Sequence, residues 1–327
     1  MKLGILGTGF IITDALEAIS EVPEIEKKAI LARPKSKAKG EEFAAKYGIG
    51  KVYTDYEELL SSDEIDTVYV GLINSVHFEY TKKALLAGKD VILEKPFTTT
   101  VEETRELVQT AKEQGRYLFE AITNRHSKVY ERMKQELPNI GRIRLGMGNY
   151  SQYSSRYDRY KQKDVAPAFD PQAFGGALND LGIYNLSLAV SLLGLPKETR
   201  YDANVGFNGV DISGVATLRY EDFIVTLSVA KDSDSPCYFT VQGEDGYLRI
   251  PGKPNEAERL EIRVGDHYEE YVPEPDKNRM VQEFRDFAAM QSSGDRERMQ
   301  AELDVTVRVM ETLAAIRTNM NGVVETD

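Results

Sequence analysis

Two short segments of the chain contain side chains that could steer or transfer a proton. One is Glu94-Lys95-Pro96, and the other runs from Gly175 to Tyr184 and includes Asp180. A lysine ammonium can donate a hydrogen bond to a substrate oxygen, and a tyrosine phenol, whose ordinary pKa is about 10, can donate a proton to a carbonyl. A cation beside that phenol would lower its pKa and make the reverse reaction feasible. The alternatives are a surface lysine and a tyrosine that packs in the core.

A glycine-rich turn, Gly7-Thr8-Gly9, follows the first apolar segment. It fits the first two glycines of a dinucleotide-binding turn, in which one glycine permits the tight bend and the other lets the backbone approach a pyrophosphate. A helix that starts near Phe10, with Ile11 in its first turn, would point the N–H groups of these residues at those phosphates. The third position is Ile12 rather than a small residue, so we expect looser packing of helix on strand there. A plain strand–helix turn is the alternative.

The segment after the second apolar stretch bears on the choice of nucleotide. It contains Arg33 and Lys37 and no acidic residue. An acid at this place would bind the ribose 2′-hydroxyl of NAD, whereas a basic residue accommodates the 2′-phosphate of NADP. The sequence therefore favours NADP over NAD, with a solvated basic turn as the alternative.

The first 120 residues alternate short apolar segments with amphipathic ones. The apolar segments lie at residues 2–6, 28–32, 67–71, 90–94 and 117–121. This alternation predicts a doubly wound parallel sheet with helices on both faces. Glu94-Lys95-Pro96 would then lie at the carboxyl end of the strand over residues 90–94, where such sheets bind ligands. Pro96 can fix the backbone there, and a cis bond is one way to do so.

The pattern changes after residue 121. A long strand at 143–153 and a helix near 181–193 precede strand after strand between 199 and 272, and two helices close the chain. A period of two with close turns predicts a mainly antiparallel sheet. We therefore expect an α/β protein with a dinucleotide-binding domain over residues 1–121. A second α/β domain over residues 122–327, with a large open sheet, would bind the substrate and form oligomers.

Composition excludes several classes of protein. The net charge of −12 argues against nucleic acid or an anionic membrane as a partner. Cys237 is the only cysteine, so no disulfide can form within the chain and we expect a cytoplasmic setting. The three histidines lack metal-ligand spacing, so no metal is expected. No apolar run approaches the roughly 18 residues of a membrane span.

Four motifs, taken in order, resemble those of the Gfo/Idh/MocA oxidoreductase family. They are Gly7-Thr8-Gly9, Asn74-Ser75-Val76-His77, Glu94-Lys95-Pro96 and the segment 175–184. The resemblance covers nearly the whole chain. It implies a Rossmann domain, a C-terminal α/β domain with an open sheet, bound NAD(P), and homodimers or homotetramers formed through that sheet.

The resemblance also implies roles for individual residues. Lys95 would hold the substrate and Asp180 would orient it. Asn74, His77 and Glu94 would lie with Lys95 beside the cofactor. For His77 the alternative is simply the first residue of a helix.

The residue four places after Asp180 separates branches of the family. Inositol dehydrogenases look like Asp-x-Gly-x-His-x-x-Asp, whereas this chain has Tyr184 and Ser187 in the last two places. Tyrosine there resembles the branch with glucose–fructose oxidoreductase and dimeric dihydrodiol dehydrogenase, which implies that Tyr184 is the acid/base. A helix would place Asp180 and Tyr184 on the same side. The chain departs from the family at Leu72-Ile73, where Thr-Pro is usual, and at Ala168, where an arginine is usual.

These observations predict an NAD(P)-dependent dehydrogenase or reductase. It would move a hydride between nicotinamide and a sugar, a polyol or a related carbonyl or hydroxyl compound. Two other classes stay open: a sensor that binds NAD(P) without turnover, and an NAD-dependent hydrolase or lyase that acts on a sugar derivative.

Overall fold

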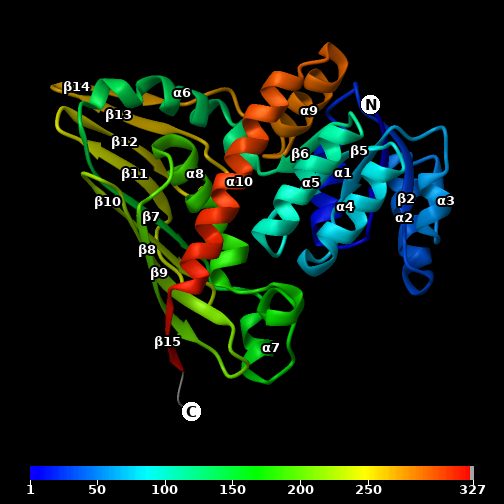
Figure 1. The fold of residues 1–327 in the computed structure, drawn as a ribbon, viewed down its shortest axis with the longest axis horizontal. Helices are drawn as coiled ribbons and strands as arrows, with labels where there is room; N and C mark the ends of the chain where they lie inside the picture. The colour runs from blue at the N-terminus through cyan, green and yellow to red at the C-terminus, as the bar shows by residue number, and fades with distance from the viewer. Residues whose placement is uncertain (325–327) are drawn as a thin grey trace. The chain divides into compact units, whose positions relative to one another are not determined.

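The computed structural model describes residues 1–324, which form two compact units (Figure 1). The first unit consists of Met1–Ala121 together with Asp276–Val307. The second consists of Ile122–Pro275 and the residues from Arg308 onward. Each unit is built on its own β-sheet.

The described part of the first unit contains a six-stranded parallel sheet in the order β3-β2-β1-β4-β5-β6. Its strands are β1 (Lys2–Leu6), β2 (Glu26–Leu31), β3 (Lys51–Tyr53), β4 (Thr67–Val70), β5 (Asp90–Glu94) and β6 (Leu118–Ala121). This is the strand order of a Rossmann fold. Every residue of β4, β5 and β6 is buried, as in a sheet that is covered on both faces. The predicted doubly wound parallel sheet is confirmed.

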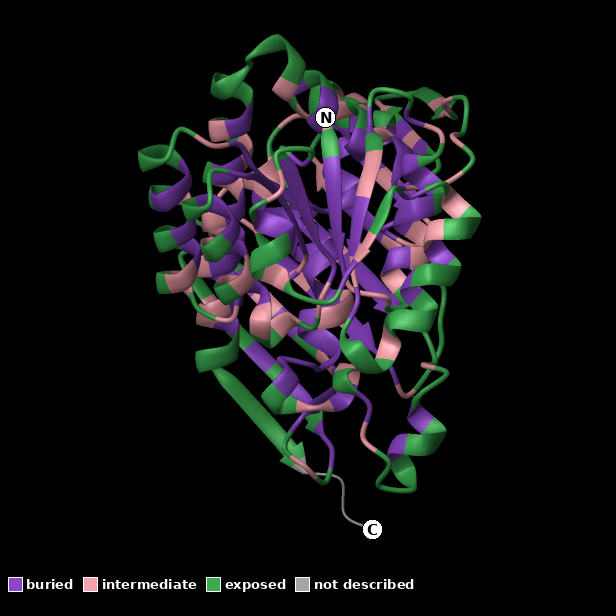
Figure 2. Cartoon of the chain, turned by 90° about the vertical axis from the view of Figure 1, so that its right-hand side faces the viewer, coloured by how far each residue is buried: buried purple, intermediate pink, exposed green. Residues whose placement is uncertain are grey.

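Helices flank this sheet, and Figure 2 shows the buried strands between helices whose outer faces are exposed. They are α1 (Phe10–Ile19), η1 (Pro34–Ser36), α2 (Lys37–Tyr47), α3 (Tyr56–Leu60), η2 (Asn74–Val76), α4 (His77–Leu86), α5 (Val101–Glu113), α9 (Val281–Ser293) and the start of α10 (Arg296–Thr318). Helix α9 returns to this unit from far along the chain. There Phe284 packs edge-on against Tyr69, and Phe287 stacks on Phe119.

The described part of the second unit contains a nine-stranded sheet in the order β14-β13-β12-β11-β7-β10-β9-β8-β15. Its strands are β7 (Ile143–Ser151), β8 (Glu198–Val205), β9 (Asp211–Arg219), β10 (Ile224–Ala230), β11 (Tyr238–Gly243), β12 (Gly246–Pro251), β13 (Leu260–Val264), β14 (His267–Tyr271) and β15 (Met320–Val324). Neighbours run antiparallel except for β7 with β10 and β8 with β15. The sheet is therefore mainly antiparallel, as predicted.

The helices of the second unit gather on one face of this sheet (Figure 1). They are η3 (Thr123–His126), α6 (Lys128–Glu136), η4 (Leu137–Ile140), α7 (Tyr157–Lys161), η5 (Pro167–Phe169), η6 (Pro171–Ala173), the π-helical turn η7 (Leu178–Gly182), α8 (Ile183–Leu193) and the end of α10. Helix α8 is buried from Ile183 to Val190 and packs on β7 and β10. No helix in residues 1–324 combines the length and the apolar character needed to cross a membrane.

Candidate active site

The turn after β1 is tight at Gly7 and open at Gly9. Gly7 has φ +109°, a left-handed conformation that favours glycine, and its N–H donates a hydrogen bond to Leu31 O at 3.0 Å. A side-chain carbon at Gly7 would lie 3.0 Å from the carbonyl oxygen of Gly71. At Gly9 no described atom lies within 4 Å of the corresponding position. The two glycines thus meet the two requirements of a phosphate-binding turn.

Helix α1 begins directly after this turn. Gly9 offers no side-chain cap, the first turn holds no acidic residue, and Phe10 is 73% exposed. The helix N–H groups are therefore not neutralised by a side chain of the first turn, which suits an anionic ligand. The expectation of loose packing at Ile12 is wrong. Ile12 is fully buried, and it fits because Gly71 has no side chain to occupy the same space.

Arg33 and Lys37 lie exposed just beyond β2, at the starts of η1 and α2. Lys37 is 3.6 Å from Glu41, and both side chains are more than half exposed. Such a surface ion pair is weak, so it does not prevent Lys37 from turning to another anion. Both cations therefore remain candidates for contact with a nucleotide phosphate.

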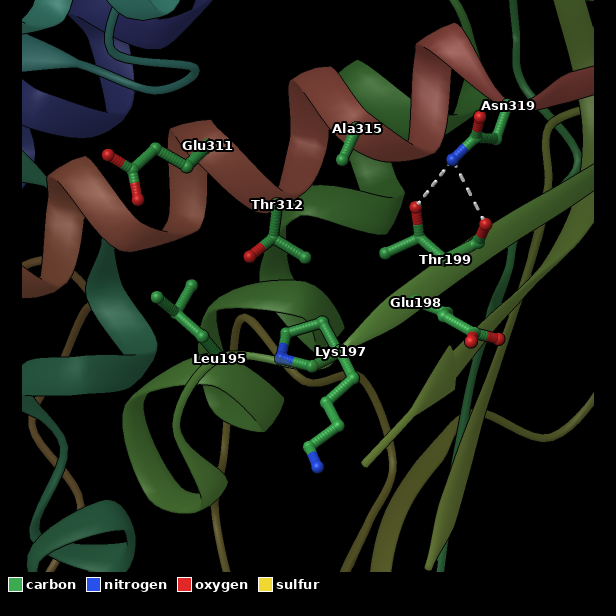
Figure 3. A pocket seen from close by; sticks show the side chains of 9 residues that line it. Leu195, Lys197, Glu198, Thr199, Glu311, Thr312, Ala315 and Asn319 are labelled. Carbon is green, nitrogen blue, oxygen red and sulfur yellow. Dashed lines mark hydrogen bonds between the residues drawn. The ribbon is translucent and has the colours of Figure 1, made fainter. Parts of the chain in front are cut away.

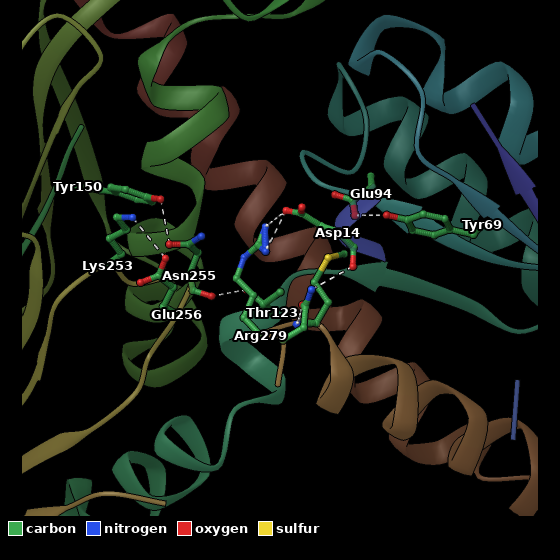
Figure 4. A network of polar contacts seen from close by, with 11 residues as sticks. Asp14, Tyr69, Glu94, Thr123, Tyr150, Lys253, Asn255, Glu256 and Arg279 are labelled. Atoms are coloured by element: carbon green, nitrogen blue, oxygen red, sulfur yellow. Dashed lines mark hydrogen bonds and ion pairs between the residues drawn. The ribbon is translucent and has the colours of Figure 1, made fainter. Parts of the chain in front are cut away.

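Lys95 follows the last residue of β5, and its peptide bond to Pro96 is cis. The preceding residue, Glu94, is buried; its carboxylate accepts hydrogen bonds from the Tyr69 hydroxyl at 2.6 Å and from the Lys95 N–H at 3.3 Å. Figure 4 shows the contact between Glu94 and Tyr69. Burial raises the pKa of the Glu94 carboxyl, while the Tyr69 hydrogen bond and the charge of Lys95 act against that rise. Glu94 thus anchors the backbone that carries Lys95.

His77 braces the same segment from the neighbouring loop. It begins α4 and is fully buried, with Nδ1 3.0 Å from Pro96 O and Nε2 3.2 Å from Leu72 O. Burial lowers the pKa of His77, while the contacts with the two carbonyls act against that fall. A neutral ring has one N–H, so its tautomer decides which of the two carbonyls accepts a hydrogen bond. His77 therefore lies between the carbonyls of Leu72 and Pro96 at the start of a helix. Its contact with the cofactor stays a prediction, as does that of Asn74, which lies partly buried in η2.

Sequence reasoning missed a second buried carboxyl in this unit. Glu283, on α9, is fully buried, and burial together with the nearby Glu94 raises its pKa well above the ordinary range. Arg279 acts in the opposite direction; its guanidinium lies 3.4 Å from Asp14 Oδ2 (Figure 4). Burial thus favours the neutral form of the Glu283 carboxyl.

In the second unit, Asp180 lies on the π-helical turn η7 and Tyr184 on the first turn of α8. Single π-turns inside helices frequently occur at functional sites. The Asp180 side chain is 34% exposed, and its Oδ2 lies 2.8 Å from Lys231 Nζ. Tyr184 is buried, and its main-chain carbonyl accepts a hydrogen bond from the Asn124 amide at 2.9 Å. Both predicted residues are therefore anchored by polar contacts within their own unit.

Tyr150, on β7, lies near both Tyr184 and Asp180. Its ring centroid is 6.1 Å from that of Tyr184. Burial raises the pKa of Tyr150, and Tyr184 and Asp180 both lie close enough to raise it further. The Tyr150 hydroxyl donates to Asn255 Oδ1 at 2.9 Å, and Asn255 O accepts from Thr123 (Figure 4). Tyr150 is thus protonated and engaged in a structural hydrogen bond, which makes Tyr184 the stronger acid/base candidate.

The double glycine before Asp180 is required by close packing. Gly175 lies against the main chain at Pro167 and Ala168, where an added carbon would be 2.5 Å from Pro167 O. Gly176 has φ +114°, and a side chain there would overlap Asp211 Oδ1. The buried Asp211 carboxylate accepts the N–H of Leu178 at 2.7 Å and so fixes the start of η7. The motif therefore places Asp180 through its backbone.

Lys231 is the other residue that sequence reasoning missed. The available signal was a lysine directly after the alternating strand that ends at Ala230. Lys95 belongs to the first unit, whereas Asp180 and Tyr184 belong to the second.

A groove of about 530 Å³ in the second unit lies elsewhere (Figure 3). It runs between the end of α10 and the start of β8, where Asn319 donates hydrogen bonds to the main-chain and side-chain oxygens of Thr199. None of the predicted site residues lines it. The groove therefore contributes nothing to the candidate chemistry.

Comparison with known proteins identifies both parts of the chain. Residues 1–122 match the model of an oxidoreductase family with an NAD-binding Rossmann fold, and residues 137–249 match the GFO/IDH/MocA C-terminal domain. The scyllo-inositol 2-dehydrogenase (NADP(+)) IolU of Bacillus subtilis (strain 168) is 34% identical over 89% of this chain and 88% of its own length. The trans-1,2-dihydrobenzene-1,2-diol dehydrogenase of Mus musculus is 29% identical over 76% of this chain and 74% of its own length.

Solved structures show the same fold. The complex of KijD10, a 3-ketoreductase from Actinomadura kijaniata, with NADP and TDP-benzene has a TM-score of 0.86 and 24% identity, and covers 100% of this chain and 99% of its own. Levoglucosan dehydrogenase in complex with NADH and levoglucosan has a TM-score of 0.83 and 18% identity, with 98% and 96% covered. At these identities the likeness concerns the fold alone.

Proposed function

The chain belongs to the Gfo/Idh/MocA oxidoreductase family, and from that premise we propose that Lys95, Asp180 and Tyr184 form its catalytic group. It is an NAD(P)-dependent oxidoreductase for sugar-like compounds. The observation that supports the proposal is that Asp180 on η7 and Tyr184 on α8 both lie near Tyr150. In the first unit, the glycine turn fits a dinucleotide and Lys95 ends the strand at the ligand-binding edge of the sheet.

Each side chain has a distinct task in this proposal. When bound, the nicotinamide supplies or accepts the hydride. Tyr184 gives its phenolic proton to the substrate oxygen during reduction and removes it during oxidation. Lys95 donates a hydrogen bond to the same oxygen and stabilises the negative charge that develops on it. Asp180 accepts a hydrogen bond from a neighbouring hydroxyl and so orients the ring.

We propose a cyclic compound with adjacent secondary hydroxyls, or the matching ketone, as the substrate. Scyllo-inositol and trans-1,2-dihydrobenzene-1,2-diol, named for two relatives, are both six-membered rings with hydroxyls on neighbouring carbons. Such a substrate offers one oxygen to Lys95 and Tyr184 and a second to Asp180. Tyrosine rather than histidine at position 184 therefore does not exclude an inositol.

A substrate panel tests the function. Cyclic polyols, pyranoses and open-chain polyols are offered with NAD⁺ or NADP⁺, and ring ketones with the reduced cofactors, while the absorbance of reduced nicotinamide is followed. We expect the highest kcat/KM on a cyclic vicinal diol. Cofactor binding without turnover across the panel would favour the sensor class. Product formation without net release of reduced cofactor would favour the hydrolase or lyase class.

We expect tighter binding of NADP(H) than of NAD(H). Arg33 lies exposed where the 2′-phosphate would approach, and its replacement by alanine should weaken NADP binding by about 10- to 100-fold, the worth of a hydrogen bond to a charged group. NAD affinity should change little. Calorimetric titration of both cofactors measures this, with Lys46→Ala, an exposed lysine at the far end of α2, as the control. Equal affinity for the two cofactors in the parent protein would contradict the preference.

We propose that the outer face of the nine-stranded sheet joins subunits into a homodimer or homotetramer. Apolar side chains alternate outward there on adjacent strands: Leu145 and Met147 on β7, Val215 on β9 and Ile224 on β10, with Val215 and Ile224 42% and 40% exposed. A face of this kind is typical of a contact between copies.

Light scattering after size exclusion tests the assembly. Val215→Asp should release monomers, whereas the control Leu86→Asp, at an exposed leucine of α4 in the first unit, should not. A parent protein that is monomeric at every practical concentration would rule the assembly out.

A further inference from the structure

Lys231 is a fully enclosed cation directly beside the candidate site. It follows β10, and only 2% of its side chain is exposed. Its ammonium lies 2.8 Å from Asp180 Oδ2 and 2.7 Å from Ala168 O, and 4.4 Å from the ring centroid of Phe169. A buried ammonium is retained only where such contacts replace its hydration. Its charge also acts to lower the pKa of the buried Asp211 carboxyl, against the effect of burial.

The ammonium joins the two segments that flank the double glycine. Asp180 follows Gly175 and Gly176 in the chain, and Ala168 precedes them. Ala168 is also the place where the family pattern has an arginine and this chain has none. Here the positive charge is supplied by Lys231, which directly follows β10, and not by a residue of the segment itself.

The ion pair with Lys231 determines the charge and the orientation that the Asp180 carboxylate presents to a ligand. A charge-assisted hydrogen bond favours the ionised carboxylate and fixes its orientation. The Asp180 side chain remains 34% exposed although its partner is enclosed, so the carboxylate is held from the protein side and accessible on the other. An ionised carboxylate can only accept hydrogen bonds, which matches a substrate hydroxyl that donates one.

We infer that Lys231 is a positioning residue of this enzyme: it holds the Asp180 carboxylate ionised and oriented for a substrate hydroxyl. The inference rests on the proposed function, since it assigns Asp180 to the substrate. It predicts that Lys231 matters for the reaction only through Asp180.

A kinetic double-mutant cycle tests this dependence. Lys231→Met should lower kcat/KM by about 10²-fold, largely through a raised KM, because Asp180 loses its charge partner. In an Asp180→Asn background the same substitution should change kcat/KM by less than about 3-fold. NADP affinity should stay at the parental level in every variant. Lys231→Arg, which keeps the charge, should restore part of the loss.

Controls separate positioning from general stability. Lys197→Met removes an exposed lysine that pairs with Glu221 at 2.8 Å in the same unit, and it should leave all kinetic constants unchanged. If Lys231→Met does not fold, Lys231→Arg and the double variant, in which both charges are gone, still complete the comparison with Asp180→Asn.

The possible outcomes distinguish the two ideas. A parent protein without turnover on any compound of the panel overturns the proposed function and the inference with it. An active parent whose kinetics survive Lys231→Met overturns the inference alone. So does a loss that is as large in the Asp180→Asn background as in the parent, because Lys231 would then act independently of Asp180.

Discussion

Replacement of Tyr184 by phenylalanine should lower kcat by about 10²–10⁴-fold, the usual contribution of a positioned acid or base. The substitution removes only the hydroxyl, and the buried ring keeps its place beside Tyr150, so the protein should fold. Cofactor affinity should stay within a few-fold of the parent, because Tyr184 belongs to the second unit and the glycine turn to the first. Steady-state kinetics on the best substrate, with calorimetry for the cofactor, measures both quantities.

Tyr220→Phe is the matched control for this variant. Tyr220 is another buried tyrosine of the second unit, and its hydroxyl donates to Gly194 O at 3.1 Å. Its loss should lower the Tm slightly and leave kcat unchanged. Near-parental kcat in Tyr184→Phe would assign Tyr184 to core packing and end its role as acid/base.

Lys95→Met should also lower kcat, by about 10²–10⁴-fold, because the substrate oxygen loses its cationic hydrogen-bond donor. The methionine keeps the length and the apolar stem of the side chain, so the hydrogen bonds of Glu94 should persist. Combined with Tyr184→Phe, the loss should be smaller than the product of the single losses, because both groups act on one oxygen. The double variant in the same kinetic assay measures this coupling.

Lys89→Met is the control for Lys95. Lys89 lies at the opposite end of β5, and its buried ammonium donates to Ser62 O and Ile65 O at 2.8 Å. Its replacement should lower the Tm without changing kcat. Parental turnover in Lys95→Met would contradict a catalytic site at the carboxyl end of β5. It would favour instead a sensor that binds the cofactor without turnover.

Most of the fold could be predicted from local patterns in the sequence. Five of the six parallel strands follow from apolar segments separated by amphipathic ones, whereas the short strand β3 was not predicted. That Asp180 and Tyr184 face one side, as their separation by four residues suggests, stays a prediction. In each case the interacting residues are close in sequence or repeat with a fixed period.

The features that were missed depend on contacts between distant segments. Lys231 pairs with Asp180 across 51 positions, and no local rule links them. The packing of Ile12 depends on Gly71, which lies at the end of a different strand. Likewise, α9 supplies a buried carboxyl, Glu283, and aromatic contacts to a sheet that ends in sequence at Ala121. Such contacts can be read from the folded chain but not from its periodicity.

The return of α9 has a consequence for how this protein is made and altered. During synthesis, Tyr69 and Phe119 leave the ribosome long before Phe284 and Phe287, the aromatic residues that pack against them. Until α9 emerges, part of the Rossmann core has no cover, and apolar surface of this kind attracts chaperones and neighbouring chains. For the same reason, a gene fusion that joins two relatives at residue 121 would combine the N-terminal sheet of one protein with the α9 of the other. Crossovers that keep residues 276–307 with the N-terminal segment preserve that core.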